Sequence, residues 1–113
     1  MSLHLAPNRS ALEKEFPMVH AVGRAAARAH APRLIELHWG PKDAPRIAVV
    51  GKGVTFDSGG LDVKSSAGML LMKKDMGGAA QSLGLAQMVM DAGLPVRLRV
   101  LIGAAENSIG GAA

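Results

Sequence analysis

The stretch IAVVGKGVTFDSGG, residues 47–60, decides the fold, because it joins a buried strand to a loop that carries reactive side chains. Residues 47–50 form an apolar run that Gly51 closes, which is typical of a strand covered on both faces. We expect this strand to be the central one of a sheet. The glycines, serines and aspartates of residues 51–68 predict a long loop at its carboxyl end, and long loops in compact domains are usually functional.

The residues after this loop predict a βαβ unit. Periodicity indicates a helix over residues 76–91, which Asp75 is placed to cap and which Gly93 ends. The apolar face of this helix contains Ala79, Leu83, Ala86 and Met90. Residues 96–102, VRLRVLI, alternate as a strand does, with Val96, Leu98, Val100 and Ile102 on one face. Functional groups of such a unit belong at the carboxyl ends of its strands.

The residues before the central strand are less regular. We expect residues 1–16 to be an irregular N-terminal segment, residues 17–29 to form a helix that Pro32 stops, and residues 33–39 to form a half-buried strand. The predicted fold class is therefore α/β, with a partial mixed or parallel sheet that contains the βαβ unit.

Composition limits the function classes. The chain has 113 residues, no cysteine and a net charge of +4, so it forms one domain without a disulfide framework. Its cations are scattered and aromatic residues make up 3%, which argues against nucleic acid as a partner, although a basic nucleic-acid-binding protein stays an alternative. An apolar run of membrane-spanning length and a signal-peptide pattern are both absent from the sequence, so we expect a cytoplasmic protein without membrane contact.

Five charged residues follow the central strand, namely Lys52, Asp57, Asp62, Lys64 and Asp75. A phosphate-binding loop is disfavoured because neither GxxxxGK[ST] nor GxGxxG occurs. A divalent metal site fits better, since carboxylate oxygens are the ligands that hard cations prefer. On residue types alone, solvated loop charges and a helix-capping aspartate explain the pattern as well.

Other polar residues carry weaker signals. The four histidines, His4, His20, His30 and His38, show no metal-ligand spacing, and Ser58, Ser65 and Ser66 have no histidine nearby in the sequence. Glu106 and Asn107 follow the last predicted strand. Asn107 could support a site through hydrogen bonds, or it could be an ordinary turn residue.

Three segments of the sequence share one more property, namely GKGVTFDSGG at residues 51–60, LDVKSSAGMLLMKKDMGGAA at residues 61–80 and LPVRLRVLIGAAENSIGG at residues 94–111. In this order and spacing they resemble the catalytic domain of the leucine aminopeptidase (cytosol aminopeptidase) family. The resemblance implies a metal-dependent aminopeptidase that releases N-terminal amino acids from peptides through a water activated by two divalent ions, zinc or manganese. It also implies a homo-oligomer, a hexamer in the family.

The resemblance assigns roles to five positions. Lys52, Asp57 and Asp75 match metal ligands of the family, and Lys64 matches its catalytic lysine. A lysine can ligate a metal only as the neutral amine, whereas Lys64 is expected to stay cationic and to stabilise the oxyanion of the reaction. Met72 matches a residue that lines the pocket for the first side chain, although a plain core methionine is an equally good interpretation.

Family members continue into a segment reading NTDAEGR, which supplies an aspartate, a glutamate and an arginine that are absent here. We therefore expect residues 17–113 to be a partial catalytic domain, truncated before the second metal-ligand motif and inactive alone. A non-catalytic remnant that associates with a partner chain is the alternative, because a truncated sheet exposes an unpaired strand.

Overall fold

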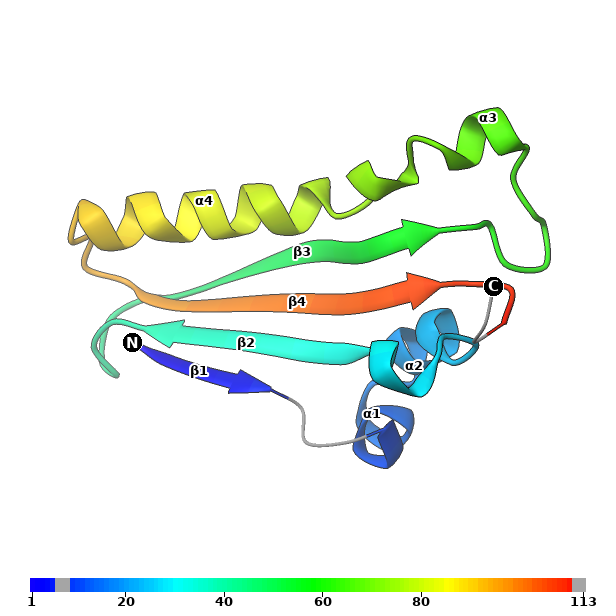
Figure 1. Ribbon diagram of the computed structural model, residues 1–113. Helices are drawn as coiled ribbons and strands as arrows, with labels where there is room; N and C mark the ends of the chain where they lie inside the picture. The colour runs from blue at the N-terminus through cyan, green and yellow to red at the C-terminus, as the bar shows by residue number, and fades with distance from the viewer. Residues whose placement is uncertain (6–8, 111–113) are drawn as a thin grey trace.

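A computed structural model describes residues 1–5 and 9–110 of the chain and shows a twisted sheet with helices on both sides (Figure 1). The sheet has the order β1-β2-β4-β3. Its strands are β1 (Ser2–Leu5), β2 (Arg33–Trp39), β3 (Arg46–Asp57) and β4 (Arg97–Asn107). β3 and β4 are parallel, while β1 with β2 and β2 with β4 are antiparallel. The mixed α/β prediction is confirmed.

The predicted βαβ unit is present. After β3 the chain passes through α3 (Ser66–Met69), the 3-10 turn η2 (Met72–Lys74) and α4 (Gly77–Asp91) before it returns as β4. α4 packs on one face of the sheet, and the alternation predicted for the last strand places three of its residues in this core. The buried cluster contains Leu37, Ala79, Ala86, Leu98, Val100 and Ile102.

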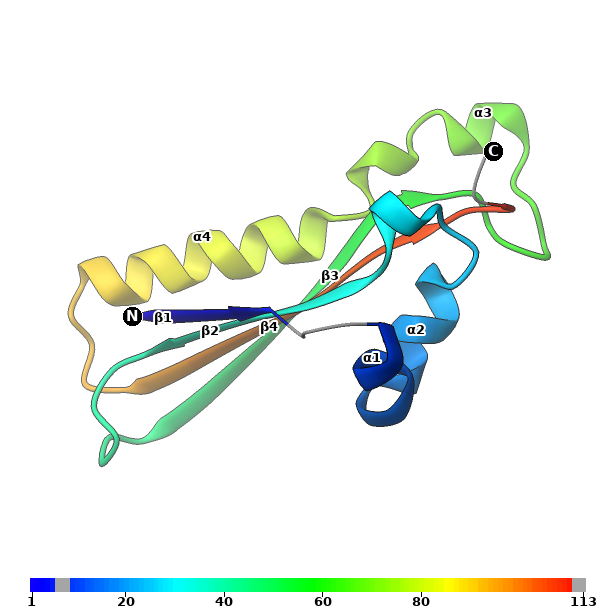
Figure 2. The ribbon, with the colours of Figure 1, turned by 60° about the horizontal axis from the view of Figure 1, so that its bottom comes forward.

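The described part of the chain covers the opposite face at one end only. Figure 2 shows α4 on one side of the sheet, with α1 (Arg9–Glu15) and α2 (Pro17–Gly23) on the other. β1 and α1 occupy the segment that was expected to be irregular. The helix predicted over residues 17–29 ends early at Gly23, where Pro32 packs so closely that a Cβ would lie 2.7 Å from the proline Cβ. The 3-10 turn η1 (Arg28–His30) follows.

The prediction of a central strand at residues 47–50 is wrong for the described residues. β4 lies between β2 and β3, so β3 is an edge strand. Val50 is 73% exposed and Ile47 is 42% exposed. The apolar run indicates a strand that can be buried, but the described part of the chain provides a neighbour on one side of it only.

The loop predicted from Gly51 is also shorter than expected, because β3 continues to Asp57. Glycine is required in this strand for close packing rather than for a turn. A Cβ on Gly51 would lie 2.6 Å from Ser82 Oγ of α4, and a Cβ on Gly53 would lie 2.6 Å from Ile102 Cγ2. The irregular segment is therefore residues 58–65.

Helix α4 differs from its prediction in two details. Met76 is its N-cap residue and makes no side-chain cap hydrogen bond, so Asp75 does not cap the helix. Its buried residues are Ala79, Ser82 and Ala86, whereas Leu83 is 48% exposed, because the helix lies along the edge strand. No helix in the described residues is long and apolar enough to cross a membrane.

Candidate functional site

The candidate residues gather where the parallel strands β3 and β4 end. Lys52 and Asp57 belong to β3, and Asn107, the last residue of β4, is the register partner of Asp57. Lys64 returns from the loop that follows β3, and Asp75 precedes α4. This is the edge at which open α/β sheets place ligands, because loops and helix starts meet there.

An irregularity in β3 places Lys52 and Asp57 on the same face of the sheet. These residues are five positions apart, so a regular strand would direct them to opposite faces. The register shifts between Val54 and Phe56, so that Lys52 pairs with Gly103 and Asp57 with Asn107, which are four positions apart on β4. A bulge inserts one extra residue into β3, and this brings the two side chains to the same face of the sheet.

The carboxylate of Asp57 is held by three donors. Lys64 Nζ lies 2.6 Å from Oδ2, while the Gly59 backbone N–H and the Asn107 amide donate to Oδ1 at 2.9 and 2.8 Å. The hydrogen bond from Lys64 lowers the pKa of Asp57 below its ordinary value; burial opposes this, and the other two donors reinforce it. Asp57 is therefore a fixed, ionised group at neutral pH.

The loop geometry that presents Lys64 depends on glycine. Gly59 and Gly60 have φ values of 92° and 68°, the left-handed region that side chains other than glycine rarely adopt. A Cβ on Gly59 would also collide with the carbonyl oxygen of Asp62. The Lys64 backbone N–H then donates to Ser58 O at 2.9 Å, which closes the loop so that the Lys64 amine meets Asp57.

Asp75 pairs with the other lysine. Lys52 Nζ donates to Asp75 Oδ1 at 2.9 Å, with 60% of the lysine side chain and 19% of the aspartate side chain exposed. The second oxygen, Oδ2, is buried and has no hydrogen-bond partner among residues 1–5 and 9–110. An unpaired buried carboxylate oxygen is costly, so Asp75 has a free ligand position.

The five predicted residues are therefore brought together in part. Lys52 pairs with Asp75, and Lys64 pairs with Asp57, but no hydrogen bond within the described residues joins one pair to the other. Met72 is half-buried in η2, three residues before Asp75. A cleft of about 570 Å³ opens beside the loop, between α2 and residues 59–62 and 107–109, and Met72 is not among its lining residues.

The donors present fit part of a divalent metal site. The free Oδ2 of Asp75 is a hard oxygen ligand, and Lys52 would become a nitrogen ligand on losing its proton. However, no group of three or more His, Cys, Asp or Glu side chains in the described residues is arranged to hold a metal ion. The chain thus provides two carboxylates and an amine rather than a complete acidic cage.

Asn107 supports the site through hydrogen bonds, one of the two roles considered for it from the sequence, and Ser58, which carried only a weak signal, holds Asn107 in place. The Ser58 hydroxyl donates to Asn107 O at 2.7 Å, and the Ser58 backbone N–H donates to the same oxygen at 2.9 Å. Together they join the end of β4 to the loop that carries Lys64. Asn107 is the last residue of β4, so the alternative of an ordinary turn residue is wrong.

Known proteins are similar to this chain in sequence and in fold. The model of the cytosol aminopeptidase family, catalytic domain, matches residues 1–113. A probable cytosol aminopeptidase of Chlamydia trachomatis serovar A is 39% identical over 115 residues, which covers 100% of this chain and 23% of the relative. The chain therefore spans about a quarter of the length of that curated relative.

Solved structures agree with this match. The cytosol aminopeptidase of Coxiella burnetii is 59% identical with a TM-score of 0.90, covering 96% of this chain and 23% of that one. The bottromycin maturation enzyme BotP in complex with Mn is 40% identical with a TM-score of 0.80, covering 94% and 23%. The fold and the two lysine–aspartate pairs define an α/β protein that carries several potential metal ligands. It belongs to the cytosol aminopeptidase family.

Proposed function

We propose that this chain carries part of the metal centre of a leucyl-type, metal-dependent aminopeptidase, which releases N-terminal amino acids from peptides. The observation that carries the proposal is the buried, unpartnered Oδ2 of Asp75, which lies on a carboxylate already held by Lys52. Membership of the cytosol aminopeptidase family supports the reaction class.

The proposed ligands are Lys52, Asp57 and Asp75, and the proposed cofactors are two divalent ions, manganese or zinc. The structure of BotP with Mn supports manganese. When bound, such ions lower the pKa of water and polarise the peptide carbonyl. Lys52 has to give up a proton to act as a ligand, because an ammonium group has no free electron pair.

The remaining roles belong to the chain's own side chains. Lys64 is the proposed catalytic residue, a cation that stabilises negative charge developing on the substrate oxygen. The ion pair with Asp57 holds the Lys64 amine at the site. The amine would leave Asp57 when negative charge develops on the substrate oxygen. Asn107 orients Asp57 through its amide, and Met72 lines the pocket for the first residue of the peptide.

We further propose that the 113 residues do not turn over peptides by themselves, since only two carboxylates of the described chain stand at the site. The cytoplasmic location, the hexamer and the extent of the catalytic part, residues 17–113, are proposals of the same kind. The exposed edge of β3 favours a second candidate, a non-catalytic chain that pairs with a partner strand.

Manganese binding tests the proposal. We expect the chain to take up Mn²⁺, monitored by the electron paramagnetic resonance signal of the free ion, and both Asp57→Asn and Asp75→Asn to weaken uptake at least tenfold. The matched control is Asp62→Asn, which removes an exposed carboxylate of the same loop. Equal uptake by all four proteins would contradict the assignment of the ligands.

Turnover separates the catalytic role from the ligand roles. In a complete enzyme that carries this sequence, we expect Lys64→Met to keep Mn²⁺ uptake and to lose hydrolysis of leucine p-nitroanilide by a factor of about 100 or more. The 113-residue chain is expected to release no p-nitroaniline above the uncatalysed rate. Hydrolysis that survives in Lys64→Met would exclude Lys64 as the catalytic residue.

A further inference from the structure

A second group of charged residues lies on the opposite half of the sheet, remote from the lysine–aspartate pairs. A cleft of about 330 Å³ is lined there by His38, Arg46, Ile47, Ala48, Arg97 and Arg99. Arg46 and Arg97 begin β3 and β4, whereas Asp57 and Asn107 end these strands. The cleft is therefore at the end of the sheet away from the site described above.

Strand register explains why the guanidinium groups gather. Arg46 is the register partner of Arg97, and Arg99 is the partner of both Ala48 on β3 and His38 on β2. Residues two positions apart on a strand share a face, so Arg97 and Arg99 lie on the same side. This is the side opposite to α4, because the alternate residues Leu98 and Val100 are buried in the core beneath that helix.

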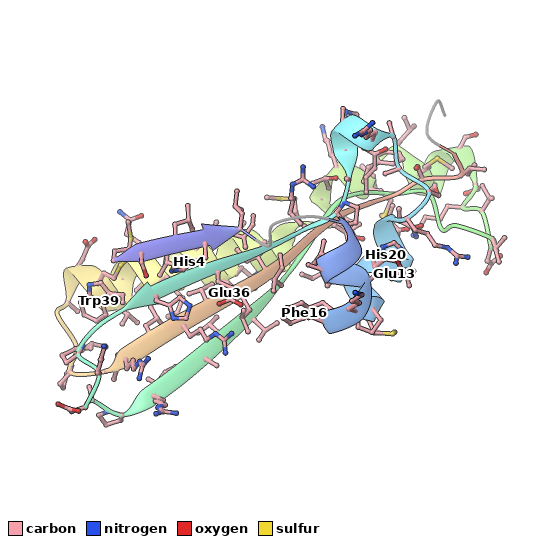
Figure 3. The ribbon with its side chains drawn as sticks, turned by 90° about the horizontal axis from the view of Figure 1, so that it is seen from below. His4, Glu13, Phe16, His20, Glu36 and Trp39 are labelled. Carbon is pink, nitrogen blue, oxygen red and sulfur yellow. The ribbon has the colours of Figure 1, made fainter. Side chains whose placement is uncertain are left out.

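No helix of the described residues covers this half of the face. α1 and α2 cover the other end, and Figure 3, which views the sheet from below, shows Glu36 on the strands away from these helices. The open half presents polar and basic side chains, of which Arg99 is 49% exposed. The arginines can therefore reach a ligand from solvent.

The charges on this surface are unbalanced. Glu36 is the one carboxylate that contacts the group within the described residues: Arg99 Nη2 donates to Oε1 at 3.1 Å, and His38 Nε2 lies 3.0 Å from Oε2. Both oxygens are thus occupied. Arg46 and Arg97 have no ion pair among the described residues. They are also register partners, and like charges placed side by side on two strands destabilise a sheet.

We propose that this cleft, between Arg46, Arg97 and Arg99, binds a small phosphate-type anion with more than one negative charge. Guanidinium groups match phosphate oxygens with paired, charge-assisted hydrogen bonds, and Arg is suited to this role because its fork is planar and always protonated. Glu36 fixes Arg99 and leaves Arg46 and Arg97 free to contact the anion. The volume is at the lower end of small-molecule sites, which fits a diphosphate group rather than a large ligand.

Pyrophosphate is the probe that tests this proposal, with titration calorimetry of the 113-residue chain as the measurement. We expect saturable binding at one site, which Arg97→Gln and Arg46→Gln each weaken about tenfold or more. Arg33→Gln is the matched control, because it removes the same charge at the other end of β2, where Arg33 faces the Pro32 carbonyl. Each variant is compared at an equal folded fraction, checked by urea unfolding.

Each result decides for or against the site. Loss of binding in both cleft variants, with binding retained in Arg33→Gln, supports the proposal. No saturable binding, or an equal loss in the control, overturns it, since general attraction to a basic protein would then explain the data. Tighter binding of a single-stranded oligonucleotide through the same arginines would show that the ligand class is wrong. Arg46 is exposed at the start of its strand, so its variant tests the site even if Arg97→Gln fails to fold.

Discussion

The amide of Asn107 donates to Asp57 Oδ1 at 2.8 Å, between two residues that parallel pairing sets side by side at the ends of β3 and β4. Asn107 is fixed in turn, because its carbonyl accepts from both the backbone N–H and the hydroxyl of Ser58. The carboxylate of Asp57 thus has its orientation set by backbone geometry as well as by Lys64. The Lys64 amine has to leave Oδ2 before Asp57 can meet a cation, but the donors to Oδ1 keep the carboxylate oriented for it.

Asn107→Leu removes this donor with little change in volume. We expect the affinity for Mn²⁺ to fall about tenfold, as loss of a group that orients a ligand does, and the free energy of unfolding to fall by about 1 to 2 kcal/mol. Calorimetric Mn²⁺ titration and urea unfolding measure the two effects. Gln87→Leu, which removes an exposed amide from α4, is the control, and unchanged Mn²⁺ affinity in Asn107→Leu would refute the orienting role.

The lowered pKa of Glu36 predicts how the free energy of unfolding depends on pH. Burial acts to raise the pKa of Glu36, but the hydrogen bonds from His38 and Arg99 outweigh it and the pKa is lowered. A lowered pKa stabilises the folded state above the unfolded value, about 4.3, and this stabilisation is lost as the pH falls through the folded value. We therefore expect Glu36→Gln to lower the urea midpoint at pH 7 and to have a much smaller effect at pH 3. An equal loss at both pH values would contradict the ionic origin.

Two glycine substitutions test the packing of α4 on β3. Gly51→Ala places a methyl group 2.6 Å from Ser82 Oγ and 2.8 Å from Ala79 Cα, so we expect it to destabilise the chain by about 1 to 3 kcal/mol. Gly84 lies in α4, and a Cβ at this position would meet nothing within 4 Å. We therefore expect Gly84→Ala to stabilise the folded chain by about 0.5 to 1 kcal/mol. Urea unfolding measures both, and the same sign for the two variants would show that helix and strand do not pack as described.

Periodicity predicted the parallel β3–α4–β4 unit because alternation in residues 96–102 and helical spacing in residues 76–91 are local signals. The bounds of β3 were not predictable in this way. Gly51 and Gly53 resemble loop residues, and only the approach of α4 and of Ile102 shows why a strand needs them. A local pattern does not record which element will pack on it.

The candidate site, like the fold, could be predicted from the sequence only in part. The resemblance supplied Lys52, Asp57, Lys64 and Asp75, and the structure groups them into two ion pairs at one end of the sheet. Neither spacing nor residue type indicated that a register shift near Thr55 would be needed to put Lys52 and Asp57 on one face. Asn107 could be proposed as a supporting residue from its position after the last predicted strand, but its contact with Asp57 depends on pairing with a strand fifty residues away in sequence.

The exposed edge of β3 predicts self-association of the 113-residue chain. Val50 is 73% exposed on an edge strand, and a free edge with apolar side chains is a template for another strand. We expect the light-scattering mass to rise with concentration and Val50→Lys to suppress this rise, because a charged lysine disfavours strand addition. Leu61→Lys, which changes a fully exposed loop residue in the same way, is the control and should leave the rise unchanged. A mass that stays monomeric in the unaltered chain would refute pairing through β3 and with it the alternative of a partner-dependent remnant.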